Sequence, residues 1–301
     1  MALWIPITLV AAFLQNIRSG LQRHLKARMG TTGATFVRFG FGAPFVLLLL
    51  AVLHFGVAVP MPVFSLRFFL WAAVGGLSQI APTFLLVQLF SLRNFAAGTA
   101  YSRTEPVMAA LFGFVLLGEP VGGASMAAIA VCSLGVMLLS VARSATGLGG
   151  MVAALGHRSA GIGLASGVLF GLSAVSYRAA STALAGPTVL MQGAVTLAVV
   201  IVGQALLMLG WMALRDPGAL RQVAQAWRPA LLVGLAGASA SLGWFTAMTL
   251  QSAGTVKALA QVEMLFTLAT SALIFREQIN RRELAGCGLV VAGLLVLVLW
   301  R

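Results

Sequence analysis

The sequence predicts an all-α membrane protein with ten transmembrane helices arranged as two inverted five-helix repeats. Three observations lead to this prediction. The chain is 60% hydrophobic and only 8% charged, whereas an ordinary soluble domain is about 25% charged. Ten apolar segments each reach the length of about 20 residues that a helix needs to cross the hydrocarbon core. Finally, one pattern of paired glutamates occurs once in each half of the chain.

The ten apolar segments account for most of the chain, so no room remains for a soluble domain. They cover residues 3–22, 33–55, 66–91, 94–117, 123–143, 160–184, 188–214, 229–250, 254–275 and 284–300. The two longest connections between them, 144–159 and 215–228, are interpreted as short loops. The first segment lacks the basic residues that precede a secretory signal, so we expect it to be a membrane helix.

The repeated pattern lies in the fourth and ninth segments. Glu105-Pro106-Val107-Met108 leads through an apolar run to Gly118-Glu119, and Glu263-Met264-Leu265-Phe266 leads through another run to Arg276-Glu277. The two copies are offset by 158 residues, and the same offset relates Gly135 to Gly293. Since each copy would contain five spans, an odd number, the second must enter the membrane from the opposite side. The predicted domains are a first repeat over 1–143, a connecting loop over 144–159 and a second repeat over 160–301.

This pattern resembles the EamA-type transporters of the drug/metabolite transporter superfamily. The resemblance rests on Glu105 through Glu119, on Gly135 in the next segment, and on the arginine-bearing stretch Phe36-Val37-Arg38-Phe39. It covers nearly the whole chain, and it implies a transporter with a central cavity lined by helices of both halves. It does not specify a substrate, because members export amino acids, sugars, nucleotide derivatives and drugs. It also implies cytoplasmic termini.

The charges of the loops indicate the opposite orientation. With alternating spans, one side of the membrane receives twelve basic residues and the other receives Arg67 and Arg301; the twelve are Arg23, Lys26, Arg28, Arg93, Arg143, Arg158, Arg215, Arg221, Arg228, Arg276, Arg281 and Arg282. The positive-inside rule makes the first side cytoplasmic. We therefore expect a multi-pass protein of a bacterial inner membrane with both termini outside the cytoplasm.

Ionisable residues within the spans are the candidate functional residues, because an ionised group at a helix centre costs at least about 2.5 kcal/mol. Glu105 and Glu263 are expected about 11 and nine residues into their segments, near the midplane of the membrane, at the depth where transporters built from repeats bind substrate. There they would hold a substrate amine or a coupling proton. The alternative is that both glutamates form structural ion pairs.

Further candidates surround the two glutamates. Arg103 is too deep in its segment to reach the interface, and it points away from Glu105 on the same helix. Tyr101 lies four residues before Glu105 and would share its helical face. Lys257 and Gln261 would form the comparable face in the second half, although Lys257 is also close enough to a helix end to extend toward water.

The remaining candidates are three arginines and one tryptophan. Arg18 and Arg178 are expected near the ends of their helices, at opposite membrane faces, as gates or as interfacial anchors. Arg38 is either a functional arginine, as the resemblance implies, or an interfacial anchor. Trp244 is the best candidate for an aromatic side chain inside the bundle. Together these sites contain five cations and two carboxylates, a balance that favours anionic substrates.

The sequence thus predicts a secondary active transporter for small polar organic metabolites, which works by alternating access and favours anionic or carboxylate-bearing zwitterionic substrates such as amino acids. The direction, export, is implied by the family resemblance alone. Alternatives are an exporter of cationic or lipophilic drugs, or a lipid-handling, scramblase-like protein.

We expect a monomer with no cofactor and no metal, since two cysteines and three histidines do not support a zinc site. An enzyme is not expected, because no histidine follows residue 157 to pair with a serine. The net charge of +13 is scattered singly among apolar runs, which argues against nucleic-acid binding. Protons are the expected coupling ion.

Overall fold

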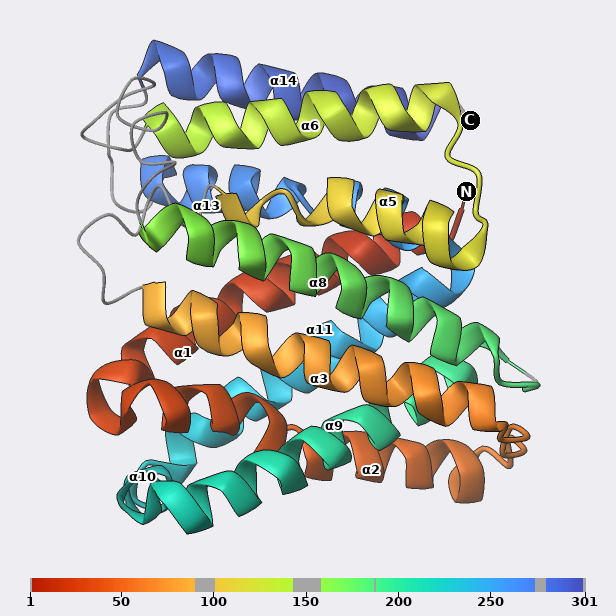
Figure 1. Ribbon diagram of the computed structural model, residues 1–301, viewed down its shortest axis with the longest axis vertical. Helices are drawn as coiled ribbons and strands as arrows, with labels where there is room; N and C mark the ends of the chain where they lie inside the picture. The colour runs from red at the N-terminus through yellow and green to blue at the C-terminus, as the bar shows by residue number, and fades with distance from the viewer. Residues whose placement is uncertain (1, 90–100, 143–157, 187, 274–279, 300–301) are drawn as a thin grey trace. The chain divides into compact units, whose positions relative to one another are not determined.

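The computed structural model describes residues 2–89, 101–142, 158–186, 188–273 and 280–299, and these are almost entirely helical (Figure 1). Within these ranges no strand forms, and an isolated bridge joins Val63 to Ala185. The helices are α1 (Trp4–Gly40), α2 (Ala43–Ala51), η1 (Val52–Gly56), α3 (Leu66–Leu89), α5 (Glu105–Leu117), α6 (Gly123–Ala142), α8 (Arg158–Thr182), α9 (Val189–Arg215), α10 (Pro217–Gln225), α11 (Trp227–Leu250), α12 (Ala253–Leu259), α13 (Val262–Leu273) and α14 (Arg281–Leu299).

Seven helical stretches of the described chain are long and apolar enough to cross a membrane, and α5 is a shorter apolar helix. The first stretch, Trp4–Gly56, has 53 residues, so as one straight helix it would be about 80 Å long, roughly twice the thickness of a bilayer. Its backbone is broken at Gly30, where φ is 67° and ψ is −173°. Figure 1 shows the chain turning back within α1. The multi-pass helical class is therefore established, while the number of ten spans stays a prediction.

Two predicted loops are helical in the structure. The first part of α1 continues past residue 22 to the break at Gly30. The connection 215–228 contains α10, which begins where the Asp216 side chain accepts a hydrogen bond from Ala219 N at 3.2 Å. Pro217 occupies the first turn of this helix, where its missing N–H costs nothing. The sequence Asp216-Pro217 was therefore a helix start that the loop interpretation overlooked.

The described chain divides into two compact units. Unit 1 consists of Met1–Ile80 and Ser176–Gln251, and unit 2 consists of Ala81–Val175 and Ser252–Arg301. The division falls within α3 and within α8. Each unit therefore combines segments from both sequence halves, and the units do not coincide with the predicted repeats.

Unit 1 is organised around α1, which packs most extensively on α11, while α2 packs on α9. Glycines allow these close approaches. Gly234 of α11 lies directly against Phe41, and a β-carbon on Gly243 would lie 2.8 Å from Ala11 Cβ. Small residues at such contacts are typical of membrane helices, where close packing replaces the hydrophobic effect as the source of association energy.

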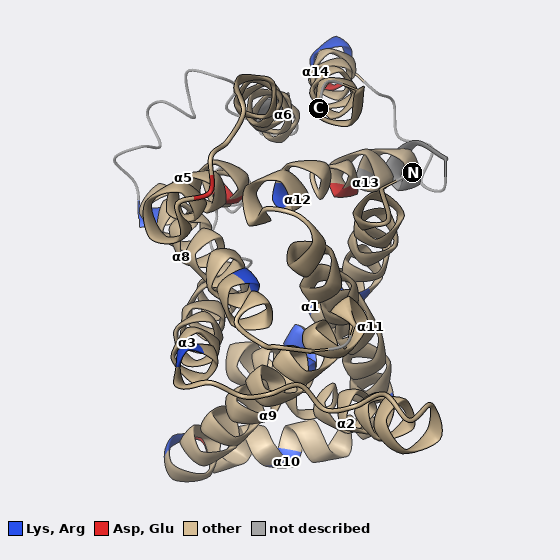
Figure 2. Cartoon of the chain, turned by 90° about the vertical axis from the view of Figure 1, so that its right-hand side faces the viewer, with Lys and Arg blue, Asp and Glu red and all other residues tan. Residues whose placement is uncertain are grey.

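In unit 2 the most extensive contact joins α6 to α14 (Figures 1 and 2). A β-carbon on Gly135 would lie 2.8 Å from both Gly286 O and Val290 N, and one on Gly293 would lie 2.9 Å from Cys132 N and 3.0 Å from Ala128 O. Residues 128, 132 and 135 match 286, 290 and 293 at the offset of 158, so the two helices make the same contact in exchanged roles. Residues with higher numbers in α6 contact residues with lower numbers in α14, so the two helices are antiparallel.

Candidate functional site

Both repeated glutamates lie at breaks between helices. Tyr101 and Ser102 are helical, Arg103 and Thr104 form a turn, and Glu105 is the first residue of α5. In the second half α12 ends at Leu259, Ala260 and Gln261 form a turn, and Glu263 is the second residue of α13. The segments 94–117 and 254–275 are therefore not single unbroken helices, and both glutamates lie in the first turn of a helix.

Local hydrogen bonds explain the two breaks. Thr104 N and Thr104 Oγ1 both donate to Tyr101 O, at 3.2 Å and 2.9 Å, which tightens the chain before α5. Pro106 follows in the first turn of α5, where it favours a helix start. In the second half Gln261 N donates to Ala258 O at 3.1 Å and Glu263 N donates to Ala260 O at 3.0 Å. The N-terminus of a helix carries partial positive charge, so both glutamates occupy positions that stabilise a carboxylate.

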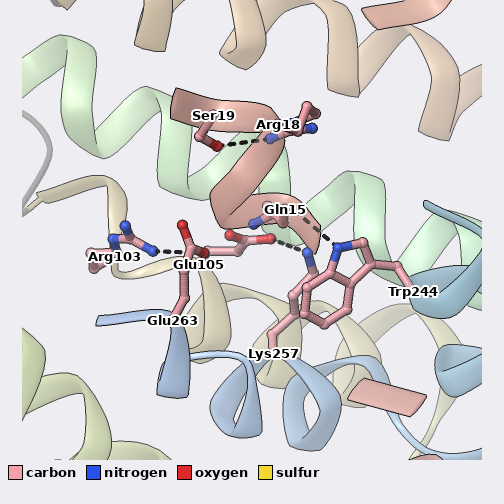
Figure 3. A network of polar contacts seen from close by, with 8 residues as sticks. All are labelled: Gln15, Arg18, Ser19, Arg103, Glu105, Trp244, Lys257 and Glu263. Atoms are coloured by element: carbon pink, nitrogen blue, oxygen red, sulfur yellow. Dashed lines mark hydrogen bonds and ion pairs between the residues drawn. The ribbon is translucent and has the colours of Figure 1, made fainter. Parts of the chain in front are cut away.

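The two glutamates form ion pairs that cross between the sequence halves (Figure 3). Lys257 Nζ of α12 lies 2.7 Å from Glu105 Oε1, and Arg103 Nη1 lies 3.6 Å from Glu263 Oε2. The first distance is that of a charge-assisted hydrogen bond, and the second is a looser ion pair. Each carboxylate is therefore neutralised by a cation from the other half of the sequence.

The packing of α5 on α12 within unit 2 brings these residues together. A β-carbon on Gly254 would lie 2.8 Å from Ala110 Cα, so the glycine permits a close contact between the two helices. The side chains of Lys257 and Glu263 are 14% and 10% exposed, against 23% for Glu105 and 30% for Arg103. Both pairs are thus partly shielded from solvent. The attraction between the paired charges is stronger there than at an open surface, because the effective dielectric constant is lower.

The predicted polar faces do not form as continuous helical faces. Tyr101 is buried, but the turn at Arg103 and Thr104 separates it from Glu105. In the second half Lys257 belongs to α12 and pairs with Glu105, while Gln261 lies in the following turn. Gln261 is 4% exposed, and its Oε1 has no hydrogen-bond partner within the described residues.

Arg178 and Trp244 both form specific contacts inside unit 1. Arg178 Nη1 donates to Met248 O at 2.6 Å and to Gln251 O at 2.7 Å. These carbonyls lie at the end of α11, where a cation is favoured by the helix dipole. Trp244 is 4% exposed, and its Nε1 donates to Gln15 Oε1 at 2.9 Å (Figure 3).

Arg18 and Arg38 are both buried in unit 1, with exposed fractions of 8% and 7%. Arg18 lies in the middle of the first part of α1 because that helix continues to the break at Gly30, so the expectation that Arg18 is near a helix end is wrong. Both arginines pack against Gly237 of α11. That the two arginines share a neighbour was not predicted.

A buried hydrogen-bond network in unit 1 was not predicted at all. Tyr177 OH donates to Gln79 Oε1 at 2.9 Å, and Gln204 Nε2 donates to Gly76 O at 2.9 Å and to Gln79 Oε1 at 3.1 Å. Tyr177 also stacks on Phe245 with a centroid separation of 4.4 Å. The available signal was the presence of uncharged amides within apolar segments, which need partners in a membrane.

Some predicted features lie outside the described residues. Arg276 and Glu277, which complete the second copy of the glutamate pattern, are among them, as are Arg93, Arg143 and Arg301 of the loop charges. Within the described residues, no group of three or more histidines, cysteines or acidic side chains is arranged to hold a metal. Cys132 is buried, and its Sγ donates to Val290 O at 3.7 Å.

Comparison with known proteins agrees with the fold and the repeat. A crystal structure titled "Crystal structure of protein" is similar with a TM-score of 0.72 and 19% sequence identity, over 99% of this chain and 96% of that chain. No match is found among curated proteins. The family model described as "EamA-like transporter family" matches twice, over residues 2–141 and 159–299. The chain therefore belongs to the EamA-like transporter family of the drug/metabolite transporter superfamily, as the glutamate pattern predicted.

Proposed function

We propose that this protein is a secondary active exporter of small polar organic metabolites, which works by alternating access and favours anionic or carboxylate-bearing zwitterionic substrates such as amino acids. Membership of a transporter family supports the general activity. The observation that carries the mechanism is the crossed arrangement of Lys257–Glu105 and Arg103–Glu263 at the two helix breaks.

Paired helix breaks at corresponding positions of two repeats are where transporters of this architecture place substrate and coupling ions. Each glutamate is held by a cation of the other repeat, so a movement of the repeats relative to each other would change both ion pairs. Protonation of a glutamate would weaken its pair and favour such a movement. In the proposal Glu105 and Glu263 therefore couple protons to transport, and Arg103 and Lys257 set their charge state.

Charge balance supports an anionic substrate. The crossed pairs combine two of the five cations in the spans with both carboxylates. The other three cations, Arg18, Arg38 and Arg178, all belong to unit 1. Arg178 is bound to carbonyls at the end of α11. Arg18 and Arg38 both pack against Gly237, and the proposal assigns them the attraction of a substrate carboxylate.

The proposal includes ten spans in two inverted repeats, and the antiparallel, exchanged contact of α6 with α14 supports it. It also places a monomer in a bacterial inner membrane, with both termini outside the cytoplasm and no chemical change to the substrate. A cysteine added before Trp4 in a variant lacking Cys132 and Cys287 tests the orientation. It should react with a membrane-impermeant maleimide on intact cells, and reaction only after cell lysis would reverse the orientation.

A second candidate function is the handling of lipophilic compounds or lipids. A groove of about 500 Å³ between α3 and α9 supports it, because the lining is apolar apart from Gln204. Other lining residues include Phe69, Leu77, Val200 and Leu207. Such a groove suits an acyl chain or a lipophilic drug better than a charged metabolite.

Flux into liposomes separates the two candidates. The purified protein would be reconstituted under an imposed pH gradient, and uptake of labelled glutamate, succinate, leucine and the lipophilic cation tetraphenylphosphonium would be measured. We expect uptake of the carboxylates, loss of gradient-driven uptake in Glu105→Gln and Glu263→Gln, and normal uptake in Arg67→Gln, which changes an exposed residue. Uptake of tetraphenylphosphonium alone would favour the second candidate. Unchanged carboxylate uptake in both glutamine variants would refute the role of the ion pairs.

A further inference from the structure

Arg18 and Arg38 occupy matching positions on the two arms of a helical hairpin. The break at Gly30 divides α1 into two parts, and Gln22 Nε2 of the first donates to Ala34 O of the second at 2.5 Å. Residues 22 and 34 are equally far from position 28, and so are residues 18 and 38. Within an antiparallel pair of arms, this register places the two arginines at the same level.

Gly237 of α11 supports the same conclusion independently. A β-carbon on Gly237 would lie 3.3 Å from Arg18 Cδ and 3.8 Å from Arg38 Cγ. The stems of both arginines therefore cross one glycine, and their Cδ and Cγ atoms are no farther apart than these two distances combined. The absence of a side chain at position 237 leaves room for both.

Two buried arginines whose stems meet at one glycine place two positive charges at one level of a helix pair. Arg18 Nη2 donates to Ser19 Oγ at 3.4 Å, and Arg38 Cζ lies 5.3 Å from the centroid of the Phe39 ring, so these contacts of the two guanidinium groups are with uncharged side chains. Unit 1 as a whole contains one acidic residue, Asp216, against ten lysines and arginines. The carboxylate of Asp216 caps the start of α10 by accepting from Ala219 N. The end of α1 stabilises Arg38 in part, because Arg38 lies in its last turn. The charge balance within unit 1 nevertheless remains strongly positive.

We propose that Arg18 and Arg38 together form a binding site for an oxyanion, a carboxylate or phosphate group of an organic substrate, at the surface of α11 next to Gly237. The guanidinium group binds such anions through two parallel hydrogen bonds, which an ammonium cannot reproduce. Two arginines match two negative charges, so organic dianions should bind more tightly than monoanions of the same length. This inference rests on the proposed transport function, since it names the part of the substrate that the transporter recognises.

Thermal unfolding of the detergent-purified protein tests this site without requiring transport. Succinate and butyrate are a matched dianion and monoanion, inorganic phosphate tests the other oxyanion, and choline is the cationic control. A ligand that binds the native state raises its unfolding temperature in a concentration-dependent way. We expect stabilisation by succinate or phosphate, a smaller effect of butyrate and none of choline.

The substitutions Arg18→Gln and Arg38→Gln should each weaken anion binding about 30-fold or more, as expected when one partner of a buried charged contact is removed. Arg18→Lys and Arg38→Lys keep the charge but lose the two parallel hydrogen bonds, so they decide the question if the glutamine variants do not fold. Arg67→Gln is the control and should bind as the unmodified protein does.

Equal anion binding by the unmodified protein and by all folded variants of Arg18 and Arg38 would overturn the site, and so would stabilisation by choline alone. Failure of the transport proposal gives a different result. In that case anions would still stabilise the protein through both arginines, while liposomes would show no flux. Flux that is normal in the variants and independent of both arginines would reject this site and leave the transport function intact.

Discussion

The Lys257–Glu105 pair offers a measurement of how strongly the two repeats are joined at the site. Replacing Glu105 by glutamine leaves the Lys257 ammonium, which is 14% exposed, without the carboxylate that lies 2.7 Å away. Breaking a fully buried ion pair costs about 3–5 kcal/mol, and an exposed pair contributes about 0–1 kcal/mol. Because this pair is partly shielded, we expect Glu105→Gln to lower the free energy of unfolding by about 1–3 kcal/mol.

A double-mutant cycle isolates the interaction of the two side chains. The unmodified protein, Glu105→Gln, Lys257→Met and the double variant would be unfolded with SDS in mixed micelles. The double variant should be less destabilised than the sum of the single variants, with a coupling energy of about 1–2 kcal/mol. The equivalent cycle on Arg103 and Glu263 should give a smaller coupling, because those atoms are 3.6 Å apart.

The control cycle combines Glu105→Gln with Arg158→Gln, since Arg158 is an exposed residue at the start of α8. Independent sites are additive within about 0.3–0.5 kcal/mol. A Lys257–Glu105 coupling energy no larger than that of the control cycle would refute the argument that these charges join the repeats.

Two further predictions concern packing and helix ends. Gly293→Ala should destabilise the protein by about 1–3 kcal/mol because its new β-carbon meets the backbone of α6, whereas Gly288→Ala on the same helix has open space and should be neutral or slightly stabilising in the same SDS titration. Equal effects of the two substitutions would contradict the α6–α14 contact. Arg178→Gln should increase hydrogen exchange at the last turn of α11, because it removes the charged donor to Met248 O and Gln251 O; unchanged exchange there would show that the arginine does not stabilise this helix end.

The fold class could be predicted from the sequence because it depends on local properties. Apolar runs of sufficient length predict membrane helices, and the glutamate pattern indicated both the repeat and the family. The contact of Gly135 and Gly293 with each other's helices follows the same offset of 158, so the repeat is visible in the packing as well.

The helix breaks were harder to predict. The break before Glu105 has a local signal in Pro106, but the break at Ala260 and Gln261 has neither a glycine nor a proline. Its turn forms in a chain that could equally continue as a helix, so tertiary packing must decide. The first break could have been predicted from Pro106, because proline favours the first turn of a helix.

The partners of the charged residues could not be predicted from one sequence. Arg103 and Glu263 are separated by 160 positions, and Arg18 and Arg38 meet at Gly237 only after the chain reverses at Gly30. A sequence specifies which residues need a partner in a membrane, but the arrangement of the helices determines which partner they find. The same limit explains why the network of Gln79, Tyr177 and Gln204 was missed.

Proton movement coupled to substrate is the most direct test of the role of the crossed glutamates. Liposomes containing a pH-sensitive dye and the reconstituted protein would be supplied with the carboxylate that the flux screen shows to be transported best. The unmodified protein should move protons with the substrate, while the Glu105→Gln/Glu263→Gln double variant should exchange labelled for unlabelled substrate without moving protons. Proton movement by the double variant equal to that of the unmodified protein would contradict the central claim.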